Sequence, residues 1–256
     1  MSEIPQIKNR SSKELSSEDN IDITFFVPCL NEEASIVGTI ETIKAAAKEA
    51  GCTYEILIID DKSIDNTISV VEEYQKAHAE DNIRLVKNRK TLGLGFNYVE
   101  GAFLGKGKYY KFVGASNQET KDSILVLLKE LGKADIIIPY LVNQKDRGLK
   151  RWMFSSLFAF LVRLLSGYPL KYYNGSAIHL RYNVMRWHAD TYGYAYQAEL
   201  IVRLLSEGKT YIEVPMLCNF RKIGKTKAFR LHNFLSVSHS LLQILLRRVR
   251  RILFKI

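Results

Sequence analysis

Short hydrophobic runs alternate with amphipathic segments through the first half of the chain, and each run ends in turn-forming residues. Such runs are typical of strands buried on both faces of a parallel sheet, and apolar residues every three or four positions are typical of helices. The pattern therefore predicts a doubly wound, mostly parallel α/β sheet flanked by helices. The expected strands are Ile21–Leu30, Tyr54–Asp60, Ile83–Lys87, Tyr109–Val113 and Ala134–Tyr140, and the expected helices are Asn31–Ala50, Thr67–Ala79, Phe96–Gly105 and Ser123–Leu131.

The pattern changes after residue 140. Arg151–Ser166 predicts an apolar helix that Arg163 interrupts, and its uncharged run is too short to span a bilayer. Further strands are expected at Ile178–Arg181 and Tyr211–Phe220, with a helix near 198–206 between them. The last segment, Leu231–Ile256, predicts an amphipathic helix with arginines clustered near its end.

Length and composition favour one domain with appended segments. Residues 1–20 are polar and lack the apolar core of a signal peptide, so we expect them to be disordered. Residues 21–230 suffice for one large α/β domain, which leaves 231–256 as a separate basic helix. The three cysteines are widely spaced and match no zinc or disulfide pattern, which favours a reducing, cytosolic setting.

The positive charge is confined to one end of the chain. No Asp or Glu follows Glu213, and residues 214–256 hold ten of the Lys and Arg residues. The remainder has 27 basic and 27 acidic residues, so the net charge of +10 lies in the last 43 residues. A localised positive segment indicates a localised anionic partner.

Carboxylates follow two of the expected strands. Asp60 and Asp61 end the second strand, and Asn31 and Glu32 follow the first. The carboxyl ends of parallel strands are where ligands bind in open α/β sheets. Carboxylates there suit hydroxyl and N–H donors such as a ribose or a nucleobase, whereas they repel bare phosphates. A narrower interpretation is that Asp61 or Ser63 only caps the next helix.

Glycine motifs for other nucleotide-binding classes are absent from the sequence. No Gly-x-Gly-x-x-Gly follows the first strand, and no Walker-type lysine loop is present. A dinucleotide-dependent dehydrogenase and a P-loop ATPase are therefore disfavoured.

Three motifs together resemble the family-two glycosyltransferases of GT-A fold. They are 27–33 (VPCLNEE), 58–67 (IIDDKSIDNT) and 92–101 (LGLGFNYVEG), and the likeness is nearest to the dolichyl- and polyprenyl-phosphate sugar synthases. It extends over roughly residues 21–230. The resemblance implies a nucleotide-sugar donor held by residues at the strand ends. These donor-binding candidates are Pro28, Leu30, Asn31, Glu32, Ile59, Asp60, Asp61, Gly114, Ala115 and Ser116.

The resemblance also implies a basic segment over the donor diphosphate. Arg221 and Lys227 match it, with Gly224 allowing the bend, and they would neutralise the charge that grows on the leaving group. A solvated basic loop is the alternative. On the acceptor side the candidates are Arg147, Arg151 and Ser155, in which the two arginines share a face if the helix begins early.

The resemblance extends to Asn174-Gly175-Ser176 and to residues 194–199 (YAYQAE), and it implies Glu199 as the candidate general base for an acceptor hydroxyl. A phosphate acceptor is already nucleophilic and would need no strong base. The alternative is that Glu199 pairs with Arg203, four residues further along the same helix.

The chain departs from the family at the metal-binding motif. GT-A enzymes commonly carry Asp-x-Asp after the fourth strand to hold Mg²⁺ or Mn²⁺, and here those positions are Gly114 and Ser116. Gln118 is the one remaining ligand candidate of the family pattern, and neutral side chains replace carboxylates poorly. Three explanations stay open: a metal held by Glu119 or Asn117, catalysis without metal, or ligand binding without turnover.

These features lead to competing functions. The first is a sugar transferase, inverting by resemblance, that uses a polyprenyl phosphate or a glycan as acceptor at the cytoplasmic face of a membrane. The terminal helix would lie on the anionic lipid surface, although packing against the domain or another subunit is the alternative. The second is a non-catalytic nucleotide-sugar-binding or scaffold subunit, and the third is a peripheral membrane module.

A membrane-protein partner or a homo-oligomer is compatible with the basic helix. Nucleic acid is not expected, because no zinc site or RNA-binding motif accompanies the charge and the aromatic residues are not interleaved with it.

Overall fold

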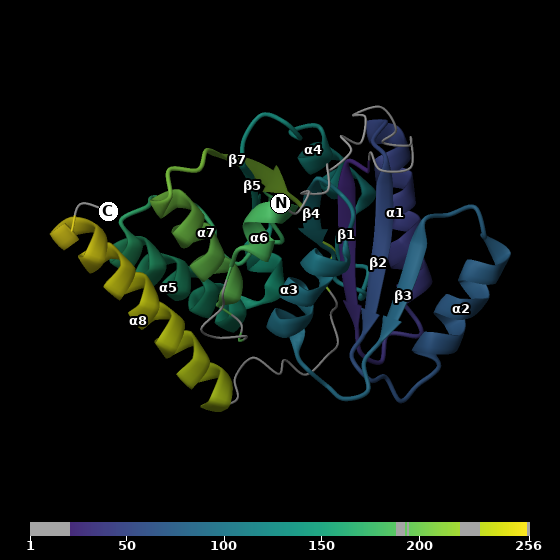
Figure 1. The fold of residues 1–256 in the computed structure, drawn as a ribbon. Coiled ribbons are helices and arrows are strands. Elements are labelled where there is room, and N and C mark those ends of the chain that lie inside the picture. The colour runs from purple at the N-terminus through teal and green to yellow at the C-terminus, as the bar shows by residue number, and fades with distance from the viewer. Residues whose placement is uncertain (1–20, 188–192, 194, 221–230, 255–256) are drawn as a thin grey trace, which may run out of the picture.

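The computed structural model describes residues 21–187, 193, 195–220 and 231–254, so the expected disorder of residues 1–20 lies outside the described residues. Strands and helices alternate along the chain and build one sheet with helices on both faces (Figure 1). The strands are β1 (Ile23–Cys29), β2 (Tyr54–Asp60), β3 (Ile83–Lys87), β4 (Tyr109–Phe112), β5 (Ile136–Leu141), β6 (Ile178–Leu180) and β7 (Tyr211–Met216). The helices are α1 (Ile36–Ala50), α2 (Thr67–Ala77), α3 (Leu94–Leu104), α4 (Lys121–Leu128), α5 (Leu149–Ser166), α6 (Arg181–Met185), α7 (Tyr196–Ser206) and α8 (Leu231–Phe254), with a 3₁₀ turn η2 (Gln144–Arg147) before α5.

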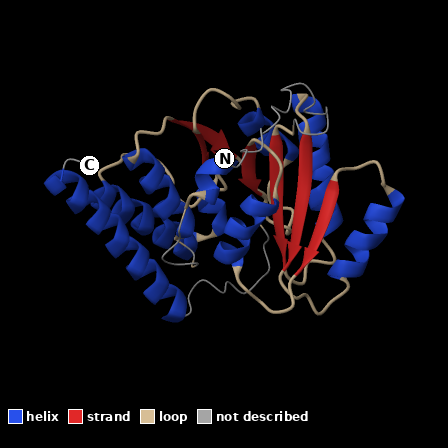
Figure 2. Ribbon diagram, viewed as in Figure 1, coloured by secondary structure: helices blue, strands red, loops and turns tan. Residues whose placement is uncertain are grey.

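The seven strands lie in the order β3-β2-β1-β4-β6-β5-β7. β3, β2, β1 and β4 are mutually parallel, and β5 is parallel to β7. β6 is antiparallel to both of its neighbours, β4 and β5, so the sheet is mixed (Figure 2). The expectation of a mostly parallel doubly wound sheet is therefore confirmed.

Successive side chains of the central strands point into two separate cores, one on each face of the sheet. Phe25 and Ile58 pack under α1, α2 and α4, whereas Phe26 and Leu57 pack under α3, α5 and α7. This alternation is the period of two expected of a strand, and both faces are apolar because helices cover both. The carboxyl ends of these strands are thereby held rigidly at one edge.

Helix α1 begins at Ile36, five residues later than expected. The Asn31–Glu33 backbone donates its hydrogen bonds to side chains of the loop after β2, so the segment forms an irregular turn. At α2, it is Asp65 and not Ser63 that accepts from the Thr67 N–H, at 3.0 Å. Side-chain competition for backbone groups of this kind shifts helix starts.

Helix α8 packs against α5 and α7 at one end of the molecule (Figure 1). Ser240 and Ile244 are its buried residues against the domain. Among the described helices, none has both the length and the hydropathy to cross a membrane.

Candidate functional site

The loops that follow β1, β2 and β4 meet at one edge of the sheet, because these three strands are adjacent and parallel. Each loop contains a non-glycine residue with a positive φ: Asn31 (60°), Lys62 (71°) and Asn117 (51°). The left-handed conformation costs an ordinary residue about 1–2 kcal/mol. Such residues cluster where a site is pre-organised, which makes this edge the candidate functional site.

Hydrogen bonds join the β1 loop to the β2 loop. The Asn31 N–H donates to Ser63 Oγ (2.9 Å), and the Ile64 N–H donates to Asn31 Oδ1 (2.8 Å). One residue further along, the Glu32 N–H donates to Thr67 Oγ1 (2.8 Å). The two loops therefore form one rigid wall of the site.

The two adjacent carboxylates of β2 have different roles. Asp60 is fully buried, and its carboxylate accepts from the N–H groups of Lys62 (3.1 Å) and Ser63 (2.9 Å). The Cys29 thiol lies 3.7 Å from the same carboxylate. Burial, followed by the charge of Asp60, raises the pKa of Cys29 far above its usual range. Asp60 thus holds its own turn, and Cys29 is an inert thiol.

Asp61 ties β2 to the loop that precedes α3. Its carboxylate accepts from the N–H groups of Leu92 (2.8 Å) and Gly93 (3.0 Å) and from Asn88 Nδ2 (3.0 Å). Burial acts to raise the pKa of Asp61, but these hydrogen bonds outweigh it and lower that pKa. Asp61 is consequently a carboxylate that stays ionised, at the mouth of the site.

The remaining donor-binding candidates lie at the same strand ends. Pro28 pairs with Ile59 across β1 and β2 in the sheet register. Ile59 is buried in the core, so it can present only its backbone to a ligand. Leu30 and Glu32 are half-buried, and the Glu32 carboxylate accepts from Ser35 Oγ at 2.7 Å.

A cavity of about 250 Å³ opens beside the end of β4. It brings the sequence-predicted Gly114, Ser116 and Gln118 together with the segment before β6 and the end of β7. Gln118 Nε2 donates to Ser116 Oγ (2.8 Å) on its wall. The lining residues are Phe112, Gly114, Ser116, Gln118, Glu119, Pro139, Leu141, Tyr172, Asn174, Gly175, Ser176, Met216, Cys218 and Phe220.

A buried ion pair lies behind this cavity wall. Lys111, in the middle of β4, is completely buried, and its Nζ lies 2.8 Å from Glu119 Oε2. Lys111 Nζ also donates to Ser176 Oγ (2.8 Å), and Ser176 Oγ lies 2.8 Å from Glu119 Oε1. Both carboxylate oxygens of Glu119 are therefore engaged, and its charge is neutralised.

The residues at the family's metal position do not fit a divalent cation. Gly114 has no side-chain ligand, Ser116 is neutral and bonded to Gln118, and Glu119 is committed to Lys111. Mg²⁺ and Mn²⁺ prefer carboxylate oxygens. Within the described ranges, no group of three or more His, Cys, Asp or Glu side chains could hold a metal ion.

The acceptor-side candidates are dispersed. Arg151 lies exposed in the first turn of α5. Arg147 ends the 3₁₀ turn η2, and Gly148, with φ at +89°, separates the two arginines. Because α5 begins only at Leu149, Arg147 is outside that helix, and the two arginines do not share a helix face.

Glu199 lies on α7 and is not among the residues that line the cavity. It is buried, and Ser240 Oγ of α8 donates to its Oε2 at 3.4 Å. The alternative partner, Arg203, instead donates from Nε to Glu207 Oε1 at 2.9 Å. Arg221 and Lys227, expected over the diphosphate, lie outside the described residues.

Sequence reasoning missed Lys111 as a charged residue behind the site, and it missed Asn88 as a partner of Asp61. Lys111 does leave a signal, because a lysine within an otherwise aromatic strand (YYKF) requires a buried counterion. Asn88 leaves none, since a polar residue after a short strand is ordinary loop composition.

Comparison with known proteins identifies relatives of this arrangement. The family model described as glycosyl transferase family 2 matches residues 24–187. A dolichyl-phosphate beta-glucosyltransferase from Dictyostelium discoideum is 33% identical over 110 residues, which cover 41% of this chain and 34% of that protein. The Drosophila melanogaster protein of the same name is 28% identical over 133 residues, which cover 49% of this chain and 41% of that protein. The chain thus spans roughly a third to two fifths of the length of these curated relatives.

Solved structures with the same fold include two transferase complexes. Glucosyl-3-phosphoglycerate synthase from Mycobacterium tuberculosis, with Mn²⁺, uridine diphosphate and phosphoglyceric acid, superposes with a TM-score of 0.66 at 17% identity, covering 89% of this chain and 78% of that one. A mannosyltransferase from Pyrobaculum calidifontis, with GDP-Man and Mn²⁺, superposes with a TM-score of 0.60 at 15% identity, covering 90% of this chain and 73% of that one. At such identities the likeness establishes the GT-A fold alone.

Proposed function

The chain belongs to glycosyl transferase family 2, and from that premise we propose that it transfers a sugar from a nucleotide-sugar donor to a polyprenyl phosphate. The site of the reaction would be the cytoplasmic face of a membrane, to which the protein is peripherally bound. The curated relatives named dolichyl-phosphate beta-glucosyltransferase support the acceptor class. Free cysteines at 29, 52 and 218 are compatible with a reducing compartment.

The observation that carries the proposal is the pre-organised edge formed by the β1, β2 and β4 loops. Its hydrogen-bonded wall and its left-handed residues at 31, 62 and 117 are held by contacts within the protein itself. Pre-organisation of this kind lowers the entropic cost of binding. We assign the nucleoside to the wall that holds Asp61, and the sugar and the acceptor to the cavity beside Gly114 and Ser116.

The proposed reaction is a single displacement. An oxygen of the acceptor phosphate attacks the anomeric carbon, and the bond from that carbon to the donor diphosphate breaks. The bonding electron pair leaves with the nucleoside diphosphate, so the configuration inverts. A phosphate monoester is nucleophilic without a general base, which agrees with the burial of Glu199 against α8.

Charge on the departing diphosphate needs compensation that residues 114–119 do not supply through a metal, since Glu119 is neutralised by Lys111. We propose that Arg221 and Lys227 supply it, with Arg151 on the acceptor side. Guanidinium and ammonium groups stabilise phosphate charge directly.

The test is a mass-spectrometric screen of nucleotide-sugars against undecaprenyl and dolichyl phosphate, with Mn²⁺ and with a chelator. We expect at least one donor to give a polyprenyl-phosphate-linked sugar, both with Mn²⁺ and with the chelator. Arg221→Gln and Lys227→Gln are each expected to lower the rate by about 10- to 1,000-fold while the protein stays folded. The proposal fails if no nucleoside diphosphate or nucleotide-sugar raises the melting temperature under either condition.

A second function is favoured by one observation. Gly114 and Ser116 replace the family's acidic pair, and Glu119 is neutralised, which is compatible with a subunit that binds a nucleotide-sugar without turning it over. That function predicts a melting-temperature shift with the donor but no product across the whole screen. Sustained transfer to any acceptor would exclude it.

A further inference from the structure

Helix α8 exposes most of its apolar face and turns several polar side chains towards the domain. The residues that face the domain are Ser240, Arg248 and Arg251 together with the apolar Leu241 and Ile244. Leu242, Ile252 and Leu253 point outward and are each more than half exposed. An ordinary surface helix packs its apolar face against the core and exposes its polar face. Leu241 and Ile244 anchor one edge of the apolar face to the domain, and the rest of that face is turned away from the protein.

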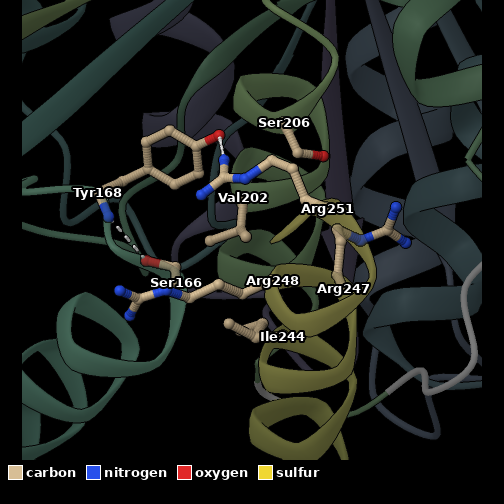
Figure 3. Close-up of a pocket in the computed structure, with 8 residues that line it drawn as sticks. All are labelled: Ser166, Tyr168, Val202, Ser206, Ile244, Arg247, Arg248 and Arg251. Atoms are coloured by element: carbon tan, nitrogen blue, oxygen red, sulfur yellow. Dashed lines mark hydrogen bonds between the residues drawn. The ribbon is translucent and has the colours of Figure 1, made fainter. Parts of the chain in front are cut away.

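Two arginines fix this orientation (Figure 3). Arg248 Nη1 donates to the Leu164 carbonyl oxygen at 2.6 Å, near the C-terminal end of α5, where cations are favoured. Arg251 hydrogen-bonds to the Tyr168 hydroxyl, and its guanidinium lies over the Tyr168 ring, 5.0 Å from the centroid. A rotation of α8 that buried its leucines would break these contacts.

Helix α5, against which α8 packs, also exposes most of its large apolar side chains. Its buried residues are the small Ala159 and Ser166 together with Val162. Its outward face consists of large apolar residues that are all more than half exposed, namely Leu149, Met153, Phe154, Leu157, Phe160 and Leu164. Exposed apolar surface on this scale marks an interaction site.

The charges on the two helices indicate which partner covers this surface. Neither α5 nor α8 contains an Asp or a Glu, and together they carry seven basic residues: Lys150, Arg151, Arg163, Arg247, Arg248, Arg250 and Arg251. Arg248 and Arg251 are held by the domain, whereas Lys150, Arg151, Arg163 and Arg250 are exposed. Large apolar side chains bordered by cations, with no anions, match the boundary of an anionic bilayer, where acyl chains lie beneath negative headgroups.

We propose that α5 and α8 together form a membrane-docking surface, which inserts its outward apolar side chains below the headgroups of an anionic lipid bilayer. α5 contributes to it as much as α8 does. The inference rests on the proposed function in its choice of a lipid surface, because the proposed acceptor is a lipid phosphate.

The test is co-sedimentation of the full chain with vesicles of phosphatidylcholine alone and of phosphatidylcholine with phosphatidylglycerol. The double variants Leu157→Ser/Phe160→Ser and Ile252→Ser/Leu253→Ser are each expected to weaken binding by at least tenfold, since each removes two inserted apolar side chains. The matched control is Phe103→Ser on α3, because Phe103 (54% exposed) and Phe160 (56%) are equally accessible. It should leave vesicle binding unchanged.

A third variant tests the charge. Lys150→Gln/Arg250→Gln should weaken binding to the anionic vesicles by roughly 25-fold, about fivefold per charge removed, and leave binding to neutral vesicles unchanged. Sedimentation velocity without lipid distinguishes a protein partner. A stable dimer that both serine double variants dissociate, together with absent vesicle binding, would overturn the proposal.

A parallel melting experiment with UDP and GDP separates this inference from the proposed function. Vesicle binding without any nucleotide response would leave the docking surface standing and remove the transferase. A nucleotide response in all serine variants, with no vesicle binding by the unmodified chain, would exclude the docking surface and leave the transferase proposal intact.

Discussion

Lys111 is a completely buried ammonium group whose charge is met by one carboxylate, that of Glu119. Taking both charges out of water is costly. The pair is stabilised because Lys111 Nζ also donates hydrogen bonds to the hydroxyl and the carbonyl oxygen of Ser176. The residue-level consequence is that Glu119 has a structural role and is unavailable to a metal ion.

Glu119→Gln should therefore lower the free energy of unfolding by about 3–5 kcal/mol, because it leaves a buried charge without its counterion. Urea denaturation measures this loss. Glu130→Gln is the control, since Glu130 pairs with the exposed Lys133 and should change the stability by less than about 1 kcal/mol. Equal losses in the two variants would contradict the role assigned to Lys111.

Asp61 gives the site a pH dependence of known sign. Its pKa is lowered in the folded protein, so its ionised form stabilises the fold above the ordinary aspartate pKa of about 3.9, and this contribution is lost as the pH falls towards the lower folded value. Asp61→Asn should flatten the fall of stability with decreasing pH in that acid range. It should also cost about 1–3 kcal/mol at neutral pH, because an amide nitrogen then faces N–H donors.

The measurement is the free energy of unfolding from denaturant titrations between pH 3 and pH 7, compared with Asp122→Asn at an exposed carboxylate of α4. An unchanged profile in Asp61→Asn would show that the hydrogen bonds from the Leu92 loop carry no net stabilisation.

At the scale of elements, the segment before β6 is held closely against β5. A Cβ added at Gly175 would lie 2.6 Å from the Pro139 carbonyl oxygen, which is backbone and cannot move aside easily. The Asn174–Ser176 segment, which leads into the short antiparallel strand β6, thus depends on one glycine for its close approach to β5.

Gly175→Ala should lower the free energy of unfolding by about 1–3 kcal/mol through overpacking. Gly114→Ala is the matched control from the same cavity, because the nearest atom to its added Cβ is 3.8 Å away, at Ser116 Oγ. Thermal and urea unfolding of both variants decide the matter. A tolerated Gly175→Ala would mean that the Asn174–Ser176 segment adjusts without cost.

The β4 loop leads to a prediction about metal dependence. In the unmodified chain, Mn²⁺ should add little to the melting-temperature shift caused by a nucleoside diphosphate, since Gly114, Ser116 and the neutralised Glu119 provide no carboxylate for it. The double variant Gly114→Asp/Ser116→Asp should acquire a shift that requires Mn²⁺ and disappears with a chelator. A metal requirement in the unmodified chain would show that other ligands serve.

At the scale of the whole molecule, the sequence predicts the architecture well where turn residues bound each element. β2 and β3 begin and end at the expected residues. β2 is a buried aliphatic run, and β3, which is mostly half-buried, is bounded by Asn82 and Asn88. The direction of β6 was not predictable, since a strand of three residues carries no pattern that distinguishes parallel from antiparallel pairing.

The site was less predictable than the fold. The sequence indicates that Asp60 and Asp61 lie together at a strand end, yet which one turns inward depends on contacts with Lys62 and with the distant Leu92 loop. The same holds for α8, whose periodicity defines an apolar face but not the side on which that face lies. Tertiary contacts made these choices, and local sequence does not contain them.

The hydrogen bonds between the β1 and β2 loops have a kinetic consequence. The N–H groups of Asn31 and Glu32, in the β1 loop, donate to side chains that follow β2. In the opposite direction, the N–H groups of Ile64 and Asn66 donate to side chains of the β1 loop, the latter to Glu33 Oε2. Neither set can open alone, so hydrogen exchange at these amides should report one common free energy of opening, as in a cooperative unit. A ligand that contacts either loop would then slow exchange in both.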